Sequence, residues 1–159
     1  MVLRRCVVFW RGPKSPNAQR AAGEGEERGR YSRHFRLPEV GPAGQAKLKA
    51  ARVLCIGAGG LGSPAALYLA AAGVGSLGLL DFDTVDDSNL QRQVLFATAD
   101  VGRPKAVVAA EKLRAQNPFI ALQTHQLVLS AANALVLFAG YDLVVDFSDN
   151  IAPRDLVTD

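Results

Sequence analysis

The chain has 159 residues, of which 49% are hydrophobic and 21% are charged. These proportions fit one soluble globular domain and argue against a disordered chain. The two cysteines, Cys6 and Cys55, are too few for a disulfide scaffold or an all-cysteine zinc site, so we expect a reduced, cytoplasmic setting. The longest apolar stretch, residues 61–80, is interrupted by Pro64 and several glycines, which argues against a membrane span.

The net charge of +3 conceals an asymmetry along the chain. Residues 1–52 hold 12 Lys and Arg against 4 Asp and Glu, whereas residues 53–159 hold 6 against 11. A basic arm can bind nucleic acid, but no aromatic-interleaved basic stripe or nucleic-acid motif accompanies it, so we expect no nucleic-acid partner. Residues 1–29 are interpreted as a flexible, basic leader, with a transit peptide as a weaker alternative.

From residue 30 onward, apolar runs alternate with helical patterns. The runs predict four strands, over residues 52–56, 76–80, 119–126 and 143–146. Helical periodicity and stop signals predict four helices, over residues 45–51, 65–72, 105–116 and 131–138. This alternation predicts an α/β fold, a Rossmann-like parallel sheet with flanking helices. The chain stops shortly after the fourth strand, so we expect the sheet to be truncated there, with one edge and one apolar face uncovered.

A glycine-rich motif, Gly57-Ala58-Gly59-Gly60-Leu61-Gly62, directly follows the first predicted strand and precedes a helix. In Gly-x-Gly-x-x-Gly, the first glycine permits a tight turn, the second lets the backbone approach phosphate, and the third allows close helix–strand packing. Asp81 lies 24 residues after Gly57, at the end of the second strand, where a ribose-binding acid belongs. Asp83 is a second candidate for the same task. These residues predict a site for a nucleotide.

Two cations follow the same nucleotide-binding edge. Arg92 lies in the segment Ser88-Asn89-Leu90-Gln91-Arg92-Gln93, and Lys105 opens the next helix. An arginine fork and a lysine charge suit a triphosphate better than a dinucleotide, whose pyrophosphate is bound largely by backbone. A dinucleotide-dependent oxidoreductase is therefore a weaker alternative. After the fourth strand, Asp149 is the candidate for holding magnesium against the phosphates, and Asp146 serves either the site or a turn.

Six segments of the chain occur together and in the order typical of one family. Through these segments the chain resembles the ThiF/MoeB family, the prokaryotic relatives of ubiquitin-activating enzymes. They are Arg30-Tyr31-Ser32-Arg33 and residues 57–63, 80–85, 88–93, 102–105 and 148–150. Within the family, they are most similar to those of molybdopterin-synthase adenylyltransferases, and the resemblance covers residues 30–159. It implies ATP-dependent adenylation, in which the C-terminal glycine of a ubiquitin-like sulfur-carrier protein attacks the α-phosphate and releases pyrophosphate.

The resemblance also implies roles for single residues. Asp81 would bind the ribose, and the turn at Gly59 and Gly60 would lie against the nucleotide. The residues expected to serve the phosphates are Asn89, Arg92 and Lys105. Asp149 would hold the magnesium ion that accompanies ATP.

Arg33 matches an arginine that family members supply across a dimer interface, so the resemblance implies that a homodimer completes the catalytic site. Family members continue past the position that matches Asp159, through a carrier-binding region and paired zinc cysteines. We therefore expect no zinc site in this chain. A non-catalytic ATP-binding remnant or interaction module stays open as an alternative to an adenylating enzyme.

Overall fold

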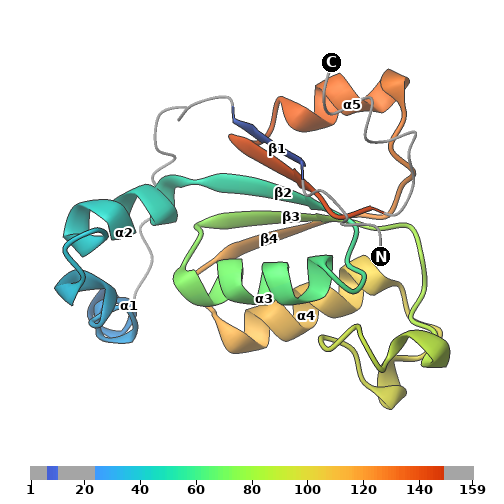
Figure 1. The fold of residues 1–159 in the computed structure, drawn as a ribbon, viewed down its shortest axis with the longest axis horizontal. Coiled ribbons are helices and arrows are strands. Elements are labelled where there is room, and N and C mark those ends of the chain that lie inside the picture. The colour runs from blue at the N-terminus through green and yellow to red at the C-terminus, as the bar shows by residue number, and fades with distance from the viewer. Residues whose placement is uncertain (1–6, 11–23, 149–159) are drawn as a thin grey trace, which may run out of the picture.

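The structure, a computed structural model, describes residues 7–10 and 24–148, which form a five-stranded sheet with helices on both faces (Figure 1). The strands are β1 (Val7–Trp10), β2 (Arg52–Ile56), β3 (Ser76–Leu80), β4 (Ala121–His125) and β5 (Leu143–Asp146). Their order across the sheet is β1-β5-β2-β3-β4. β2 to β5 run parallel, and β1 is antiparallel to β5. The predicted Rossmann-like fold class is confirmed.

The helices lie on both sides of this sheet. They are α1 (Glu24–Arg30), α2 (Gly41–Ala50), α3 (Gly62–Ala72), α4 (Lys105–Gln116) and α5 (Ala131–Phe138). Figure 1 shows α3 and α4 on one face and α5 on the other, with α1 and α2 beyond the end where β2 begins. No helix in the described part of the chain is both long and apolar enough to cross a membrane.

The alternating side chains of each strand build two hydrophobic clusters. One cluster joins the sheet to α3 and α4, through Val53, Cys55, Leu77, Leu79, Ala66, Ala70, Val108 and Leu113. The other joins it to α5, through Leu54, Ile56, Leu80, Val144, Ala134 and Phe138. Small alanines on α3 let that helix lie close to the strands. Its N-terminus lies at the carboxyl end of β2 because only the short glycine loop separates the two elements.

Most predicted elements agree with the structure, and the differences have local causes. α3 begins at Gly62 rather than residue 65, because Pro64 is tolerated in a first helical turn. It ends at Gly73, whose φ of +85° is the left-handed cap conformation that favours glycine. β4 begins later than residue 119, because the Phe119 amide donates to the Asn117 side-chain oxygen in a turn instead of to a strand.

The strand β1 and all but the last residue of the helix α1 lie within residues 1–29, for which the sequence predicts no regular element. β1 pairs with β5 in a register that runs from Val7 opposite Asp146 to Trp10 opposite Leu143. Its four residues are β-branched or aromatic, a composition typical of strands. The expected open edge beside the fourth parallel strand is wrong, because β5 lies between β2 and β1.

Candidate nucleotide-binding site

A cavity of about 580 Å³ opens at the carboxyl ends of the parallel strands, where sheets of this kind hold their ligands. Its walls come from the glycine loop after β2, the segment after β3, the loop before α5 and the turn after β5. The predicted site residues that line it are Gly57, Gly59, Gly60, Asp81, Asp83, Asn89, Arg92 and Lys105. Segments distant in sequence therefore meet at one cavity.

The glycine loop is shaped by two close approaches. Gly57 has a φ of +85°, and its amide donates to the Leu80 carbonyl over 2.7 Å. A Cβ atom added to Gly62 would lie only 1.8 Å from the Gly57 oxygen, so the third glycine of the motif permits close packing as predicted. At Gly60 the nearest atoms to such a Cβ are those of the Arg92 side chain, 3.6 Å away. The loop is therefore tight toward the helix and open toward the cavity.

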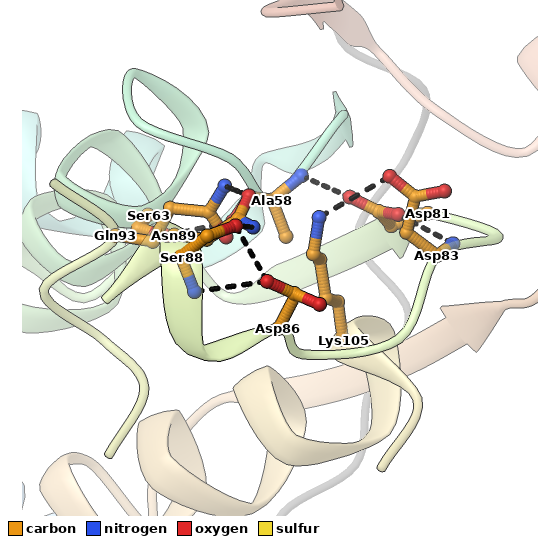
Figure 2. A network of polar contacts seen from close by, with 9 residues as sticks. All are labelled: Ala58, Ser63, Asp81, Asp83, Asp86, Ser88, Asn89, Gln93 and Lys105. Carbon is orange, nitrogen blue, oxygen red and sulfur yellow. Dashed lines mark hydrogen bonds and ion pairs between the residues drawn. The ribbon is translucent and has the colours of Figure 1, made fainter. Parts of the chain in front are cut away.

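Asp81 joins the end of β3 to the glycine loop. Its side chain is buried, and one carboxylate oxygen accepts from the Ala58 amide over 2.7 Å while the other accepts from the Asp83 amide over 2.9 Å (Figure 2). Each carboxylate oxygen has further lone pairs, so these two bonds leave acceptor capacity for ligand hydroxyls. Asp81 thus orients the loop from a position on the cavity wall.

Lys105 begins α4 and points into the cavity. Its Nζ lies 3.2 Å from the Asp83 Oδ2, and its backbone amide donates to the Asp83 carbonyl over 2.9 Å. The lysine side chain is only 7% exposed, whereas that of Asp83 is 52% exposed. In Figure 2 the ammonium group lies between the acids after β3 and the polar residues that follow Asp86.

Arg92 lies on the exposed side of the cavity. Its Nη1 contacts the Ser88 carbonyl at 3.4 Å and the Gln91 Oε1 at 3.3 Å. Both acceptors are neutral, so the guanidinium keeps its positive charge available for a ligand anion.

Asp86 caps the short 3-10 helix Asp87–Asn89 that carries Asn89 to the cavity. Its Oδ1 accepts from the Ser88 amide over 2.8 Å and from the Ser88 hydroxyl over 2.5 Å. These hydrogen bonds, that of the hydroxyl foremost, hold the pKa of Asp86 below its ordinary value. Asn89 donates to the Ser88 Oγ and accepts from Gln93, which lies beside it (Figure 2).

Two predicted residues in the described part of the chain, Gly62 and Arg33, do not line the cavity. Arg33 is exposed, lies in the segment between α1 and α2 and does not line the cavity. That segment is at the opposite end of the sheet from the glycine loop (Figure 1). Asp149, the predicted magnesium ligand, lies outside the described residues.

The turn before Asp149 is described up to Ser148. Asp146 is buried, and its Oδ1 accepts from the Ser148 amide over 2.7 Å, which is the turn role considered for it. Within residues 7–10 and 24–148, no group of three or more His, Cys, Asp or Glu could hold a metal ion. The assignments of magnesium and the absence of zinc therefore stay predictions.

Some residues of the cavity wall are not predicted as site residues from the sequence. Phe82 and Val128 are more than half exposed and give the wall apolar surface, while Gln93 is buried beside Gly59. The signal for Phe82 was its position between two predicted acids. Val128 lies in a loop that carries no motif, so only the folded chain reveals it.

Comparison with known proteins agrees with this arrangement. The chain is 58% identical over 134 residues to MoeZ of Mycobacterium tuberculosis, a probable adenylyltransferase/sulfurtransferase, covering 84% of this chain and 34% of MoeZ. It is 52% identical to the sulfur carrier protein adenylyltransferase of Thermus thermophilus, covering 84% of this chain and 49% of that protein. The chain thus spans between about a third and a half of the length of these relatives.

Solved structures show the same fold. The tRNA N6-threonylcarbamoyladenosine dehydratase TcdA of Escherichia coli is similar with a TM-score of 0.81 and 29% identity, over 87% of this chain and 57% of TcdA. Escherichia coli MccB, solved with ATP, is similar with a TM-score of 0.61 and 34% identity, over 68% of this chain and 33% of MccB. The ThiF family model matches residues 31–159. With most of its length covered by that match, the chain belongs to the ThiF family.

Proposed function

We propose that this chain binds ATP and magnesium in the glycine-loop cavity and forms the nucleotide-binding part of an enzyme that adenylates a ubiquitin-like sulfur-carrier protein. The observation that carries the proposal is the convergence of a glycine loop, the buried Asp81 carboxylate and the cations Arg92 and Lys105 on one cavity. The names of the relatives, a probable adenylyltransferase/sulfurtransferase and a sulfur carrier protein adenylyltransferase, support the adenylation step. The ATP complexes of TcdA and MccB support the choice of nucleotide.

Each side of the cavity suits a different part of ATP. The N-terminus of α3 and the open side of the loop at Gly59 and Gly60 favour phosphate oxygens. Asp81 has acceptor capacity for ribose hydroxyls, and Phe82 and Val128 offer apolar surface to the base. The donors that face the triphosphate are Asn89, Arg92 and Lys105. We assign magnesium to Asp149, where it would neutralise phosphate charge.

The reaction that fits these residues needs no nucleophile from the chain. A carboxylate oxygen of the carrier's C-terminal glycine bonds to the α-phosphorus, and the bond from that phosphorus to the oxygen of the β-phosphate breaks. Pyrophosphate leaves with the electron pair, and an acyl-adenylate remains. Catalysis then consists of positioning and of stabilising negative charge, which Lys105 and Arg92 can do.

Arg33 has a place in this scheme only if a second copy of the chain supplies it. The arginine is exposed and belongs to the opposite end of the sheet from the cavity of its own chain. We propose that a homodimer brings Arg33 of each subunit to the site of the other. Dimerisation would then be a requirement for catalysis rather than for nucleotide binding.

Equilibrium binding of MgATP and of NAD to the purified chain tests the proposal. We expect saturable MgATP binding that is tighter than NAD binding and that weakens when magnesium is removed. Tighter NAD binding would contradict the ATP assignment and favour an oxidoreductase. A second measurement, carrier-dependent exchange of pyrophosphate into ATP, tests the adenylation step. MgATP binding without any exchange would contradict catalysis by this chain and favour a nucleotide-binding module.

A further inference from the structure

The polar residues between Asp86 and Gln93 form a hydrogen-bonded chain whose direction is fixed at one end (Figure 2). The Asp86 carboxylate can only accept hydrogen bonds when it is ionised. The Ser88 hydroxyl has a single hydrogen and donates it to Asp86 over 2.5 Å. The Ser88 oxygen must therefore accept from its other neighbour, which is the Asn89 side chain at 3.2 Å.

The direction of the Ser88 hydrogen bonds also fixes the orientation of the Asn89 and Gln93 side-chain amides. Because Ser88 has no second hydrogen to give, the end of the Asn89 amide that faces it is the nitrogen. The Asn89 oxygen then faces Gln93 and accepts from the Gln93 Nε2 over 2.7 Å. An isolated pair of amides could exchange its nitrogen and oxygen ends, but a carboxylate at the start of the chain excludes that arrangement.

As a result, the Asn89 side chain presents a nitrogen donor and the Gln93 side chain presents an oxygen acceptor. The Asn89 nitrogen has a second N–H besides the one given to Ser88, and a weaker interaction also draws this amide toward the Asp86 carboxylate. Asn89 lines the cavity together with Arg92 and Lys105. Gln93 is only 3% exposed, lies beside Gly59, and its Oε1 has no hydrogen-bond partner among the described residues. A buried acceptor without a partner is costly, so it marks a place where a donor is expected when the cavity is filled.

We propose that Asp86 is a positioning residue that acts through Ser88, orienting the Asn89 amide so that an N–H group, and not a carbonyl oxygen, faces the phosphates of the nucleotide. The same chain keeps the Gln93 Oε1 as an acceptor for a donor of the bound nucleotide or for an ordered water. This inference rests on the proposed ATP site. Asp86 does not line the cavity. Besides capping the turn through the Ser88 amide, it acts by fixing which end of the Asn89 amide faces the cavity.

The variant Ser88→Ala isolates this role, because it removes the hydroxyl but leaves the Asp86 cap on the Ser88 backbone amide, at 2.8 Å. We expect its affinity for MgATP to fall by about 10-fold, the effect of losing one hydrogen bond to a charged group. Its affinity for adenosine, which has no phosphate, should be unchanged. Ser88→Thr keeps a hydroxyl and should restore MgATP binding.

A matched pair of charge deletions controls for electrostatics. Asp86→Ala and Asp87→Ala each remove one exposed carboxylate from the same turn, but only Asp86 begins the hydrogen-bonded chain. We expect Asp86→Ala to weaken MgATP binding and Asp87→Ala to leave it unchanged or slightly stronger. Asn89→Ala completes a double-mutant cycle, in which Ser88→Ala should cause no further loss once Asn89 is absent.

The outcomes distinguish failure of the positioning role of Asp86 from failure of the ATP site on which it depends. If the wild-type chain binds MgATP and Ser88→Ala binds it equally well, the positioning role is wrong. If Ser88→Ala weakens adenosine and MgATP by the same factor, Ser88 supports the fold of the turn and the positioning role is also wrong. If the wild-type chain does not bind MgATP at all, the proposed function is wrong, and the positioning role of Asp86 is wrong with it.

Discussion

Lys105 and Asp83 form an ion pair at the mouth of the glycine-loop cavity, with 3.2 Å between the lysine Nζ and the carboxylate Oδ2. The two partners are unequal, because the lysine is nearly buried and the aspartate is half exposed. The aspartate can therefore turn into water at little cost while the lysine remains where it is. The pair presents a cation that is already positioned and whose counter-ion a phosphate can replace.

We predict that Lys105→Met weakens MgATP binding by at least about 10-fold, because the methionine keeps the buried stem and loses the charge. The midpoint of thermal unfolding should change little, since Asp83 can be solvated. Lys112→Met is the matched control on the same helix, where the lysine pairs with Asp100 at 2.9 Å, away from the cavity. Binding isotherms in which both variants lose the same affinity would contradict the assignment of Lys105.

The glycine loop gives a prediction in which two neighbouring substitutions differ. Gly62→Ala should destabilise the fold by more than about 2 kcal/mol, because the new methyl group would lie 1.8 Å from the Gly57 oxygen. Gly60→Ala should fold normally and weaken MgATP binding, because its methyl group has room beside Arg92 but narrows the phosphate side of the cavity. Denaturant unfolding and nucleotide titration of both variants separate the effects. Normal stability of Gly62→Ala would disprove the first part.

Tyr141 gives a prediction for alkaline pH. Burial raises the pKa of its phenol to about 12, and the group hydrogen-bonds to His125 and Gln123 on the face that α5 covers. A folded-state pKa above the unfolded value stabilises the protein fully below about pH 10, and this stabilisation is lost as the pH rises toward 12. We expect Tyr141→Phe to lose about 1 kcal/mol at neutral pH and to show a smaller fall in stability between these pH values.

Ultraviolet difference spectroscopy checks the same group directly. The wild-type protein should show a late-ionising component from Tyr141, and that component should be missing in Tyr141→Phe. The exposed Tyr68→Phe is the control and should retain the late component. Ionisation of all tyrosines near pH 10 in the folded protein would contradict the burial argument.

Arg33 gives a prediction about mixed subunits. Arg33→Ala and Lys105→Met should each abolish carrier-dependent pyrophosphate exchange when they are tested alone. An equal mixture should recover up to about one quarter of wild-type activity, because half of the dimers are mixed and each has one intact site. A mixture of Lys105→Met with Asn89→Ala, which both damage the cavity of their own chain, should recover less. Mixed dimers that form and show no recovery would exclude supply of Arg33 from the second subunit.

The parts of the fold that could be predicted from sequence are those with local signals. The helix Lys105–Gln116 and the strand Arg52–Ile56 have strong periodicity or an unbroken apolar run, and both agree with the structure at their ends. The strand Val7–Trp10 could not be predicted in the same way. Its four apolar residues have no partner nearby, and only the distant strand β5 makes them a strand.

In the candidate site, too, the residues with local sequence signals could be predicted, and those whose role depends on the fold could not. Residue type and spacing restrict the roles of the glycines, Asp81 and Lys105, which is why the sequence predicts them. All of these except the buried Gly62 line one cavity. The role of Asp86 depends on the direction of three successive hydrogen bonds, which no spacing records. Arg33 was predicted from a motif alone, and its distance from the cavity became visible only in the fold.

The pairing of β1 with β5 has a consequence for the order in which the protein folds. β1 precedes the other described strands in the sequence, and its partner β5 follows them. During synthesis β1 therefore has no native partner until β5 is made, and in that time its apolar residues can form non-native pairings while β2, β3 and β4 assemble. Completion of the sheet also secures β5, whose final residues lead directly into the turn that packs on Gly57. The glycine-loop cavity can therefore become native only after β5 has formed, because a contact between strands far apart in the sequence must close first.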